Sequence, residues 1–257
     1  MRRNVQNRYV GDVGDYGKYG LLRALCNPRT RLRLGVVWYL VPNERKGGDG
    51  RLVGYLSRNS RKDEELAVCD PALFRVLGEI VRRGSRDVRA VRARAVLPAG
   101  TFFYERRLDY TGLKKADRLA LRAAWLAEAQ DSMRECDIVF LDPDNGIAGR
   151  VQKHLLKAPK FVFLDEILPY IQRGQSVLVY HHLNRRAPAE TQVRSVSSLL
   201  KKAVPNGVEV TFLRYHRGTA RIYAILAVQK HVAIVRERIS KLAAGPWGRH
   251  FALASTK

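Results

Sequence analysis

The sequence predicts an α/β fold, in which a mostly parallel sheet carries helices on both faces and ends in a C-terminal antiparallel hairpin. Short apolar runs alternate along the chain with stretches whose apolar residues recur at helical spacing. Two β-rich runs, at 208–215 and 221–228, are separated by five residues that include Gly218, which is a hairpin signal. A hydrophobic fraction of 46% over 257 residues is enough for one core.

The remaining elements follow from periodicity and from the residues that end each segment. Asn27 and Pro28 end the first expected helix, and residues 161–164 are compatible with a strand as well as with a helix. We expect residues 1–242 to form a single domain and 243–257 to form a C-terminal tail. In chain order the expected elements are a helix at 14–26, a strand at 34–41, a helix at 70–83, strands at 88–96 and 101–104, a helix at 117–133, a strand at 138–141, a helix at 158–172, a strand at 176–180, a helix at 189–203, the hairpin, and a helix at 231–242.

Composition points to a polyanionic partner. Lys and Arg number 47 against 24 Asp and Glu, a net charge of +23 that favours nucleic acid. A preference for Arg over Lys does not create net charge, so it does not explain this excess. The three cysteines are far apart, without metal-ligand spacing, as in a reducing cytosol. No apolar run of about 18 residues is present, so we expect a cytoplasmic protein without membrane contact.

The expected strand at 138–141 is followed directly by Asp142, Pro143, Asp144 and Asn145. In open α/β sheets, ligands bind beyond the carboxyl ends of the strands. Two carboxylates, a rigid proline and an amide therefore stand where a site is expected. The alternative is an ordinary turn that leaves a core strand.

A second polar segment, residues 8–19, forms the entry to the first expected helix and contains Gly11, Asp15, Lys18 and Tyr19. Asp15 is compatible with a simple N-cap, and Lys18 with a solvated side chain. The segment also resembles the start of the large-subunit ribosomal RNA adenine-N6-methyltransferase J family, in which a Gly, an Asp and a Lys have the same mutual spacing. Tyr19 stands where that family has a cofactor-contacting His.

The resemblance extends to the order of elements over roughly residues 8 to 228, and it implies a Rossmann-like class I methyltransferase fold. It also implies S-adenosyl-L-methionine as cofactor and methyl transfer to nucleic acid, RNA or DNA, with adenine N6 as the expected target. The implied cofactor-binding residues are Asp15, Lys18, Tyr19, Asn43, Glu44 and Thr101. The candidate catalytic residues are Asp142, Pro143, Asp144 and Asn145, the loop that falls where the family has Asp-Pro-Pro-Tyr.

The chain departs from the family in its catalytic loop. Asp144 and Asn145 replace the Pro-Tyr of the family's Asp-Pro-Pro-Tyr, so the aromatic that stacks on the flipped base is missing from its place. Tyr9, Tyr180 and His181 are the candidate replacements that contact the substrate.

Two other functions remain open. Asp142, Asp144 and Glu166 are oxygen ligands suited to Mg²⁺, which would make the chain a metal-dependent nuclease or phosphodiesterase. Glu166 is also compatible with an exposed helix face, which is the favoured of the two interpretations. His181 and His182 leave a strand in opposite directions, so they do not form one metal site. The third function is a non-catalytic nucleic-acid-binding module.

Overall fold

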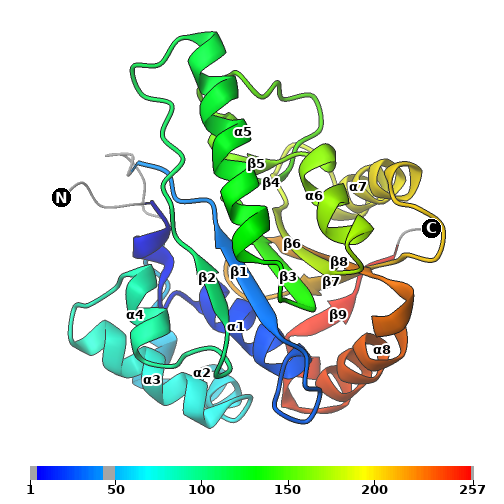
Figure 1. Cartoon of the computed structure of the whole chain (residues 1–257). Helices are drawn as coiled ribbons and strands as arrows, with labels where there is room; N and C mark the ends of the chain where they lie inside the picture. Colours follow the sequence, from blue (N-terminus) through cyan, green and yellow to red (C-terminus); the bar gives the residue numbers. More distant parts are fainter. Residues whose placement is uncertain (1–4, 43–49, 256–257) are drawn as a thin grey trace.

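A seven-stranded sheet, in the order β2-β1-β3-β6-β8-β7-β9, forms the centre of the protein (Figure 1). The computed structural model describes residues 5–42 and 50–255. β2, β1, β3 and β6 are parallel, whereas β8 runs antiparallel between β6 and β7, and β9 pairs antiparallel with β7. The bounds are β1 (Leu34–Trp38), β2 (Phe102–Tyr104), β3 (Ile138–Asp142), β6 (Ser176–His182), β7 (Glu209–Tyr215), β8 (Arg221–Ala227) and β9 (Phe251–Leu253). The predicted fold class is confirmed.

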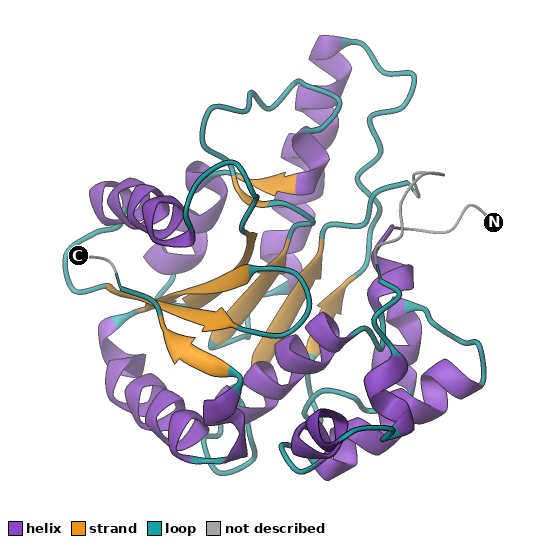
Figure 2. Cartoon of the chain, turned by 180° about the vertical axis from the view of Figure 1, so that it is seen from behind, coloured by secondary structure: helices purple, strands orange, loops and turns teal. Residues whose placement is uncertain are grey.

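Helices cover both faces of this sheet, as the front and back views show (Figures 1 and 2). The hydrophobic cluster on one face includes α1 (Val13–Leu25), α2 (Arg61–Ala67), α3 (Pro71–Arg82), α4 (Val88–Ala93) and α8 (Gln229–Ala244). The cluster on the other face includes α5 (Lys115–Ser132), α6 (Leu164–Gln172) and α7 (Ala189–Ala203). None of the described helices is long and apolar enough to cross a membrane.

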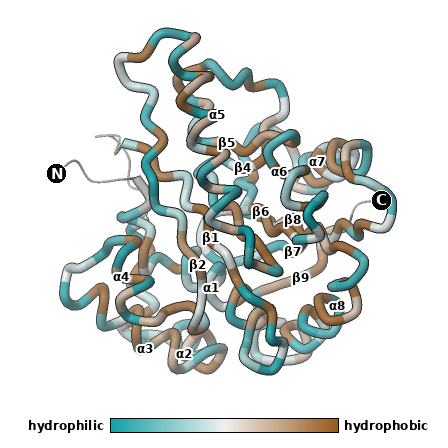
Figure 3. The backbone as a smooth tube through the Cα atoms, in the orientation of Figure 1, coloured by the Kyte–Doolittle hydropathy of each residue, from teal (hydrophilic) through white to brown (hydrophobic). Residues whose placement is uncertain are grey.

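The two clusters divide the central strands by the alternation of their side chains. In β1, Val36 and Trp38 face the α1 side, and Val37 faces the α5 side. All five residues of β1 and all five of β3 are buried, as expected for central parallel strands. Hydrophobic segments accordingly follow the central strands (Figure 3).

Residues 88–96 do not form the expected strand, because α4 occupies residues 88–93. The Asp87 carboxylate caps this helix by accepting a hydrogen bond from the Arg89 backbone N–H at 2.9 Å. Val88 and Val91, three residues apart, are both buried in the core. Their helical spacing outweighs the β propensity of valine, so the prediction of a strand was wrong.

The expected single helix at 158–172 was also wrong. The chain instead forms a 3₁₀ turn, η3 (Ala158–Lys160), and a short strand, β5 (Phe161–Val162), before α6 begins. β5 pairs in parallel with β4 (Gly146–Ile147), which follows the loop after β3. This small second sheet therefore fixes the loop that follows Asp142.

The expected C-terminal tail is largely part of the fold. Residues 246–249 form the 3₁₀ helix η4 (Pro246–Arg249), and β9 extends the main sheet. Trp247 and Phe251 are buried in the cluster on the α1 side. A Cβ atom on Gly20 of α1 would lie 2.2 Å from Trp247, so only glycine permits this contact. The division at residue 242 was therefore wrong for residues 246–253. The two other 3₁₀ helices are η1 (Val5–Tyr9) and η2 (Gly54–Ser57).

Candidate active site at the carboxyl end of the sheet

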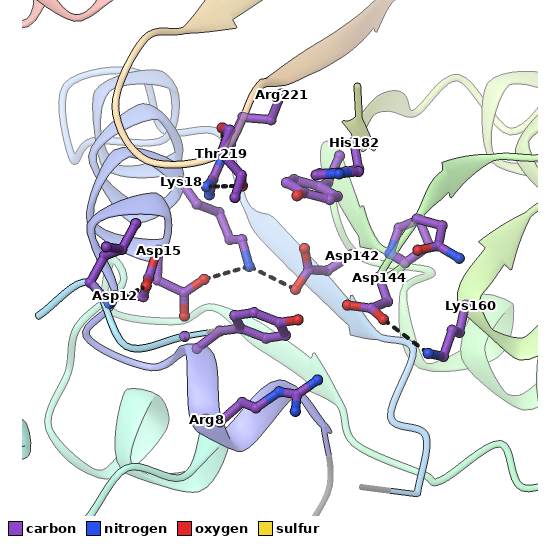
Figure 4. Close-up of a pocket in the computed structure, with 16 residues that line it drawn as sticks. Arg8, Asp12, Asp15, Lys18, Asp142, Asp144, Lys160, His182, Thr219 and Arg221 are labelled. Atoms are coloured by element: carbon purple, nitrogen blue, oxygen red, sulfur yellow. Dashed lines mark hydrogen bonds and ion pairs between the residues drawn. The ribbon is translucent and has the colours of Figure 1, made fainter. Parts of the chain in front are cut away.

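A pocket of about 450 Å³ opens where β3 and β6 end, beside the first turn of α1 (Figure 4). The hairpin turn between β7 and β8 and the segment before α1 complete its wall. The Val13 backbone N–H donates to the Leu52 carbonyl at 2.9 Å, which joins α1 to the segment after β1. The charged residues that line the pocket are balanced in number. Four are basic (Arg8, Lys18, Lys160 and Arg221) and four are acidic (Asp12, Asp15, Asp142 and Asp144).

Lys18 joins the two segments that the sequence singled out. Its Nζ lies 2.8 Å from Asp15 Oδ1 and 2.9 Å from Asp142 Oδ2, and all three side chains are buried (Figure 4). Asp15 precedes Lys18 by one helical turn, and Asp142 is the last residue of β3. One ammonium group is therefore shared by two carboxylates from distant parts of the chain.

Burial raises the pKa of the Asp142 carboxyl to about 6, although the Lys18 ammonium acts against this shift. Burial alone would lower the pKa of Lys18, but Asp142 and Asp15 outweigh it and the pKa is raised. Lys18 thus stays cationic. The Lys18 ammonium donates to Asp142 Oδ2, and no described residue donates a hydrogen bond to the other carboxylate oxygen, Oδ1. This oxygen remains able to accept an N–H from a bound molecule.

The loop after Asp142 is held by the small second sheet and by β6. The Asn145 backbone N–H donates to the Lys160 carbonyl at 2.9 Å, and the Lys160 ammonium lies 3.5 Å from Asp144 Oδ2. Gly146 has φ +106°, and a Cβ atom there would lie 2.5 Å from His181 Nδ1. Glycine is required at this position. Pro143, Asp144 and Asn145 all line the pocket, as expected.

Two of the three proposed substrate residues also line the pocket. The Tyr180 ring centroid lies 5.7 Å from Lys18 Nζ and 5.9 Å from Arg221 Cζ, and burial raises its pKa to about 12. Tyr180 is therefore a neutral phenol beside two cations. The ring of Tyr9 lies 5.3 Å from the Arg8 guanidinium and is half-buried.

Tyr19 and His181 support the pocket from behind. The Tyr19 hydroxyl donates to Asp15 Oδ2 at 2.9 Å, and neither Tyr19 nor His181 lines the cavity. His181 Nδ1 accepts the Ile147 backbone N–H at 3.0 Å, and burial, with the neighbouring His182, lowers its pKa to about 4. A neutral His181 thus has a structural contact, and His182 lines the pocket in its place.

Thr101 does not lie at the pocket. It precedes β2, whose parallel register pairs Phe102 with Gly35 near the start of β1. Thr101 is therefore at the amino end of the sheet, where its hydroxyl donates to the Pro98 carbonyl at 2.6 Å. Its expected place beside Lys18 was wrong. Asn43 and Glu44 lie outside the described residues.

Glu166 is also separate from Asp142 and Asp144. Its carboxylate is buried against the Arg122 guanidinium, with contacts of 2.5 and 2.8 Å. Its Oε2 also accepts the Phe163 backbone N–H, which caps α6. Within residues 5–42 and 50–255, no three His, Cys, Asp or Glu side chains are grouped as a metal site. The geometry does not assemble the carboxylates that the nuclease hypothesis requires.

Sequence reasoning missed several lining residues, including Arg8, Asp12 and Arg221. Asp12 lay within the polar segment already singled out, but its two contacts, with the backbone N–H groups of Gly14 and Leu52, cannot be inferred from spacing. Arg221 begins a strand of the predicted hairpin, and no local pattern distinguishes it from a solvated arginine.

Comparison with known proteins adds no functional assignment. No protein-family model matches the chain, and no curated protein is significantly similar to it.

Proposed function

We propose that this protein is an S-adenosyl-L-methionine-dependent methyltransferase that acts on nucleic acid, with adenine N6 as the expected target. The observation that carries the proposal is the Asp142 carboxylate at the carboxyl end of β3. One of its oxygens is bound by Lys18, and the other has no donor among the described residues. Pro143 follows it at the wall of the same pocket.

This arrangement suits an exocyclic amine. Asp142 Oδ1 accepts one N–H of the amine, and the Pro143 carbonyl is the expected acceptor of the other. These contacts orient the nitrogen lone pair away from the protein acceptors and toward the methyl donor. Lys18 keeps Asp142 ionised and in place. S-adenosyl-L-methionine supplies an electrophilic methyl group when bound.

The charge balance of the pocket fits that cofactor, whose amino-acid part carries both a carboxylate and an ammonium. Four acidic and four basic side chains line the cavity, so groups of both signs find a partner there. A volume of about 450 Å³ lies within the range of small-molecule sites. The pocket itself therefore does not account for the net charge of +23.

Basic residues for a nucleic acid instead lie in the loops around the pocket. Arg150 and Lys157 lie between β4 and η3, Arg185 and Arg186 follow β6, and all four are exposed. β4 follows β3 after a loop of three residues, and β3 and β6 are parallel, so both segments come after the strand ends at which the pocket opens. We propose that these side chains contact phosphates beside a nucleotide held at Asp142.

Cofactor binding is tested with Lys18→Ala and the matched control Lys157→Ala, in which an exposed lysine is removed. Calorimetric titration with S-adenosylhomocysteine is expected to show saturable binding to the native chain. Lys18→Ala is expected to weaken it by about 10-fold or more, because Asp15 and Asp142 lose the ammonium that they share in the pocket wall. Lys157→Ala should bind as the native chain does. A native chain that gives no heat and no thermal shift at millimolar ligand would refute the methyltransferase proposal.

The nucleic-acid partner is tested by the salt dependence of binding. Affinity for a structured RNA or a DNA duplex is expected to fall linearly with salt on logarithmic axes, by about 0.7 to 0.9 per phosphate neutralised. Substituting Arg185 and Arg186 together by alanine should lower this slope by about two. An affinity that is flat between low and physiological salt would contradict the nucleic-acid assignment.

A further inference from the structure

Arg221 is a buried cation in the pocket without an ion-pair partner among the described residues. It is 6% exposed and stands at the start of β8, where it is paired in register with His182 at the end of β6. Its side chain reaches into the wall of the cavity above Lys18 (Figure 4). A guanidinium taken out of water at this depth needs a compensating charge.

The contacts that hold Arg221 are neutral. Its Nε donates to the Thr219 carbonyl at 3.0 Å, and its Nη2 donates to Thr219 Oγ1 at 2.7 Å. The Tyr180 ring is the third neighbour. No described residue accepts a hydrogen bond from Nη1. The side chain is thus oriented, and one end of its planar group has N–H donors to spare.

The carboxylates of the adjacent helical turn are already engaged. Asp12 accepts the backbone N–H groups of Gly14 and Leu52, each at 2.9 Å. Asp15 accepts from the Tyr19 hydroxyl and contacts Lys18. Neither forms an ion pair or a hydrogen bond with Arg221, although both carboxylates lie close enough to help raise the pKa of its guanidinium.

Gly14 shows how close the guanidinium lies to α1. A Cβ atom at this position would be 1.5 Å from Arg221 Nη1, so the absence of a side chain leaves room for the group. Gly14 belongs to the first turn of α1, a helix of 13 residues whose N-terminus carries positive partial charge. Asp12 already caps this helix end by accepting the Gly14 N–H, so the donors left for a bound molecule are those of Arg221 Nη1.

We propose that the Arg221 guanidinium binds an oxyanion group inside the pocket. The bound oxygens belong either to the carboxylate of the cofactor's amino-acid part or to a phosphate of the nucleic acid. The inference rests on the proposed function for the identity of these two sources. The anion site itself follows from the buried guanidinium and is tested separately.

Two variants test the site. Arg221→Met keeps the length of the side chain but removes the guanidinium. Gly14→Ala keeps Arg221, but the added methyl group occupies the position of its Nη1. Arg236→Met is the control. Arg236 lies on α8 and forms an ion pair at the surface with Glu209 of β7, away from the pocket residues. Melting temperatures without ligand establish that each variant is folded. The probes are inorganic phosphate, S-adenosylhomocysteine, and methylthioadenosine, which lacks the amino-acid part.

Calorimetry is expected to show that Arg221→Met and Gly14→Ala weaken binding of an oxyanion probe by about 10- to 100-fold, while Arg236→Met does not. A loss for S-adenosylhomocysteine but not for methylthioadenosine identifies the carboxylate. A loss for phosphate alone identifies the nucleic-acid phosphate. If phosphate binds through Arg221 and neither nucleoside binds, the anion site stands and the proposed cofactor is refuted.

Three results would overturn the anion site. The first is equal affinity of Arg221→Met and Arg236→Met for every probe. The second is an equal loss for S-adenosylhomocysteine and methylthioadenosine with phosphate binding unchanged, since that would be a general effect on the pocket. The third is the absence of binding of both phosphate and S-adenosylhomocysteine to the native chain at millimolar concentration.

Discussion

Asp142→Ala is expected to lower the rate of methyl transfer by about 100- to 1000-fold while binding of cofactor and nucleic acid persists. The physical reason is that Asp142 Oδ1 is proposed to contact the reacting amine, so its loss acts on the transition state more than on the bound substrates. Single-turnover transfer of a labelled methyl group measures the rate, and calorimetry measures binding of each partner. A loss of binding equal to the loss of rate would contradict this role.

Asp144→Ala is the matched control for this experiment. Asp144 lines the same pocket, but its carboxylate is directed to Lys160, and the position corresponds to a proline in the family that the loop resembles. We expect a milder loss of rate. A metal-dependent nuclease would instead lose activity equally in both variants and in EDTA.

The pKa of Asp142 also leads us to expect a dependence of the native rate on pH. Its carboxyl group has a pKa of about 6, so the rate of methyl transfer should fall below about pH 6, where the carboxylate becomes protonated.

The position of the pocket could be predicted from two features of the sequence, the direction of the central strands and the polar residues that follow β3. The loop after β3 is at the carboxyl end of the sheet, and α1 brings Lys18 to it, so both singled-out segments meet at Asp142. Thr101 was misplaced because it precedes a parallel strand, and residues before such a strand lie at the opposite end of the sheet. Once β2 is known to be parallel to β1, its direction alone excludes Thr101 from the pocket.

Arg221 could not be found in the same way. Its place follows from the insertion of β8 between β6 and β7, which pairs Arg221 with His182. β8 runs antiparallel to β6, so its first residue lies beside the carboxyl end of β6 and reaches the pocket. The hairpin was predicted from its turn, but the order of its strands in the sheet depends on long-range pairing that local sequence does not encode.

The prediction of one helix at 158–172 was wrong for the same reason that Glu166 does not lie at the pocket. The apolar run at 161–164 satisfies both strand and helix periodicity, and the short strand that pairs with β4 takes its first half. Glu166 then falls in the first turn of α6, where its side chain caps the helix and pairs with Arg122. The alternative of an exposed helix face was wrong as well, since Glu166 is 1% exposed.

Arg122→Ala is expected to lower the free energy of unfolding by about 3 to 5 kcal/mol, because it leaves the Glu166 carboxylate buried without its partner. The Arg122 guanidinium also donates to the carbonyls of Ala158 and Phe161, at 3.0 and 2.7 Å, and these groups would lose their donor too. Urea unfolding measured by circular dichroism gives the difference. The effect is on the fold and does not involve the pocket.

Two further variants separate this pair from an ordinary surface contact and from a catalytic role. Arg134→Ala removes an arginine of similar sequence context from its exposed contact with Asp131 and is expected to cost less than about 1 kcal/mol. Glu166→Gln keeps a hydrogen-bonding group of the same shape, so it should be less damaging than Arg122→Ala and should leave methyl transfer by the folded protein close to native. If Glu166→Gln folded normally but abolished a metal-dependent cleavage of nucleic acid, Glu166 would be a catalytic ligand and its pairing with Arg122 would not be its main role. An Arg122→Ala protein as stable as Arg134→Ala would show that the buried pair does not hold α5 to α6.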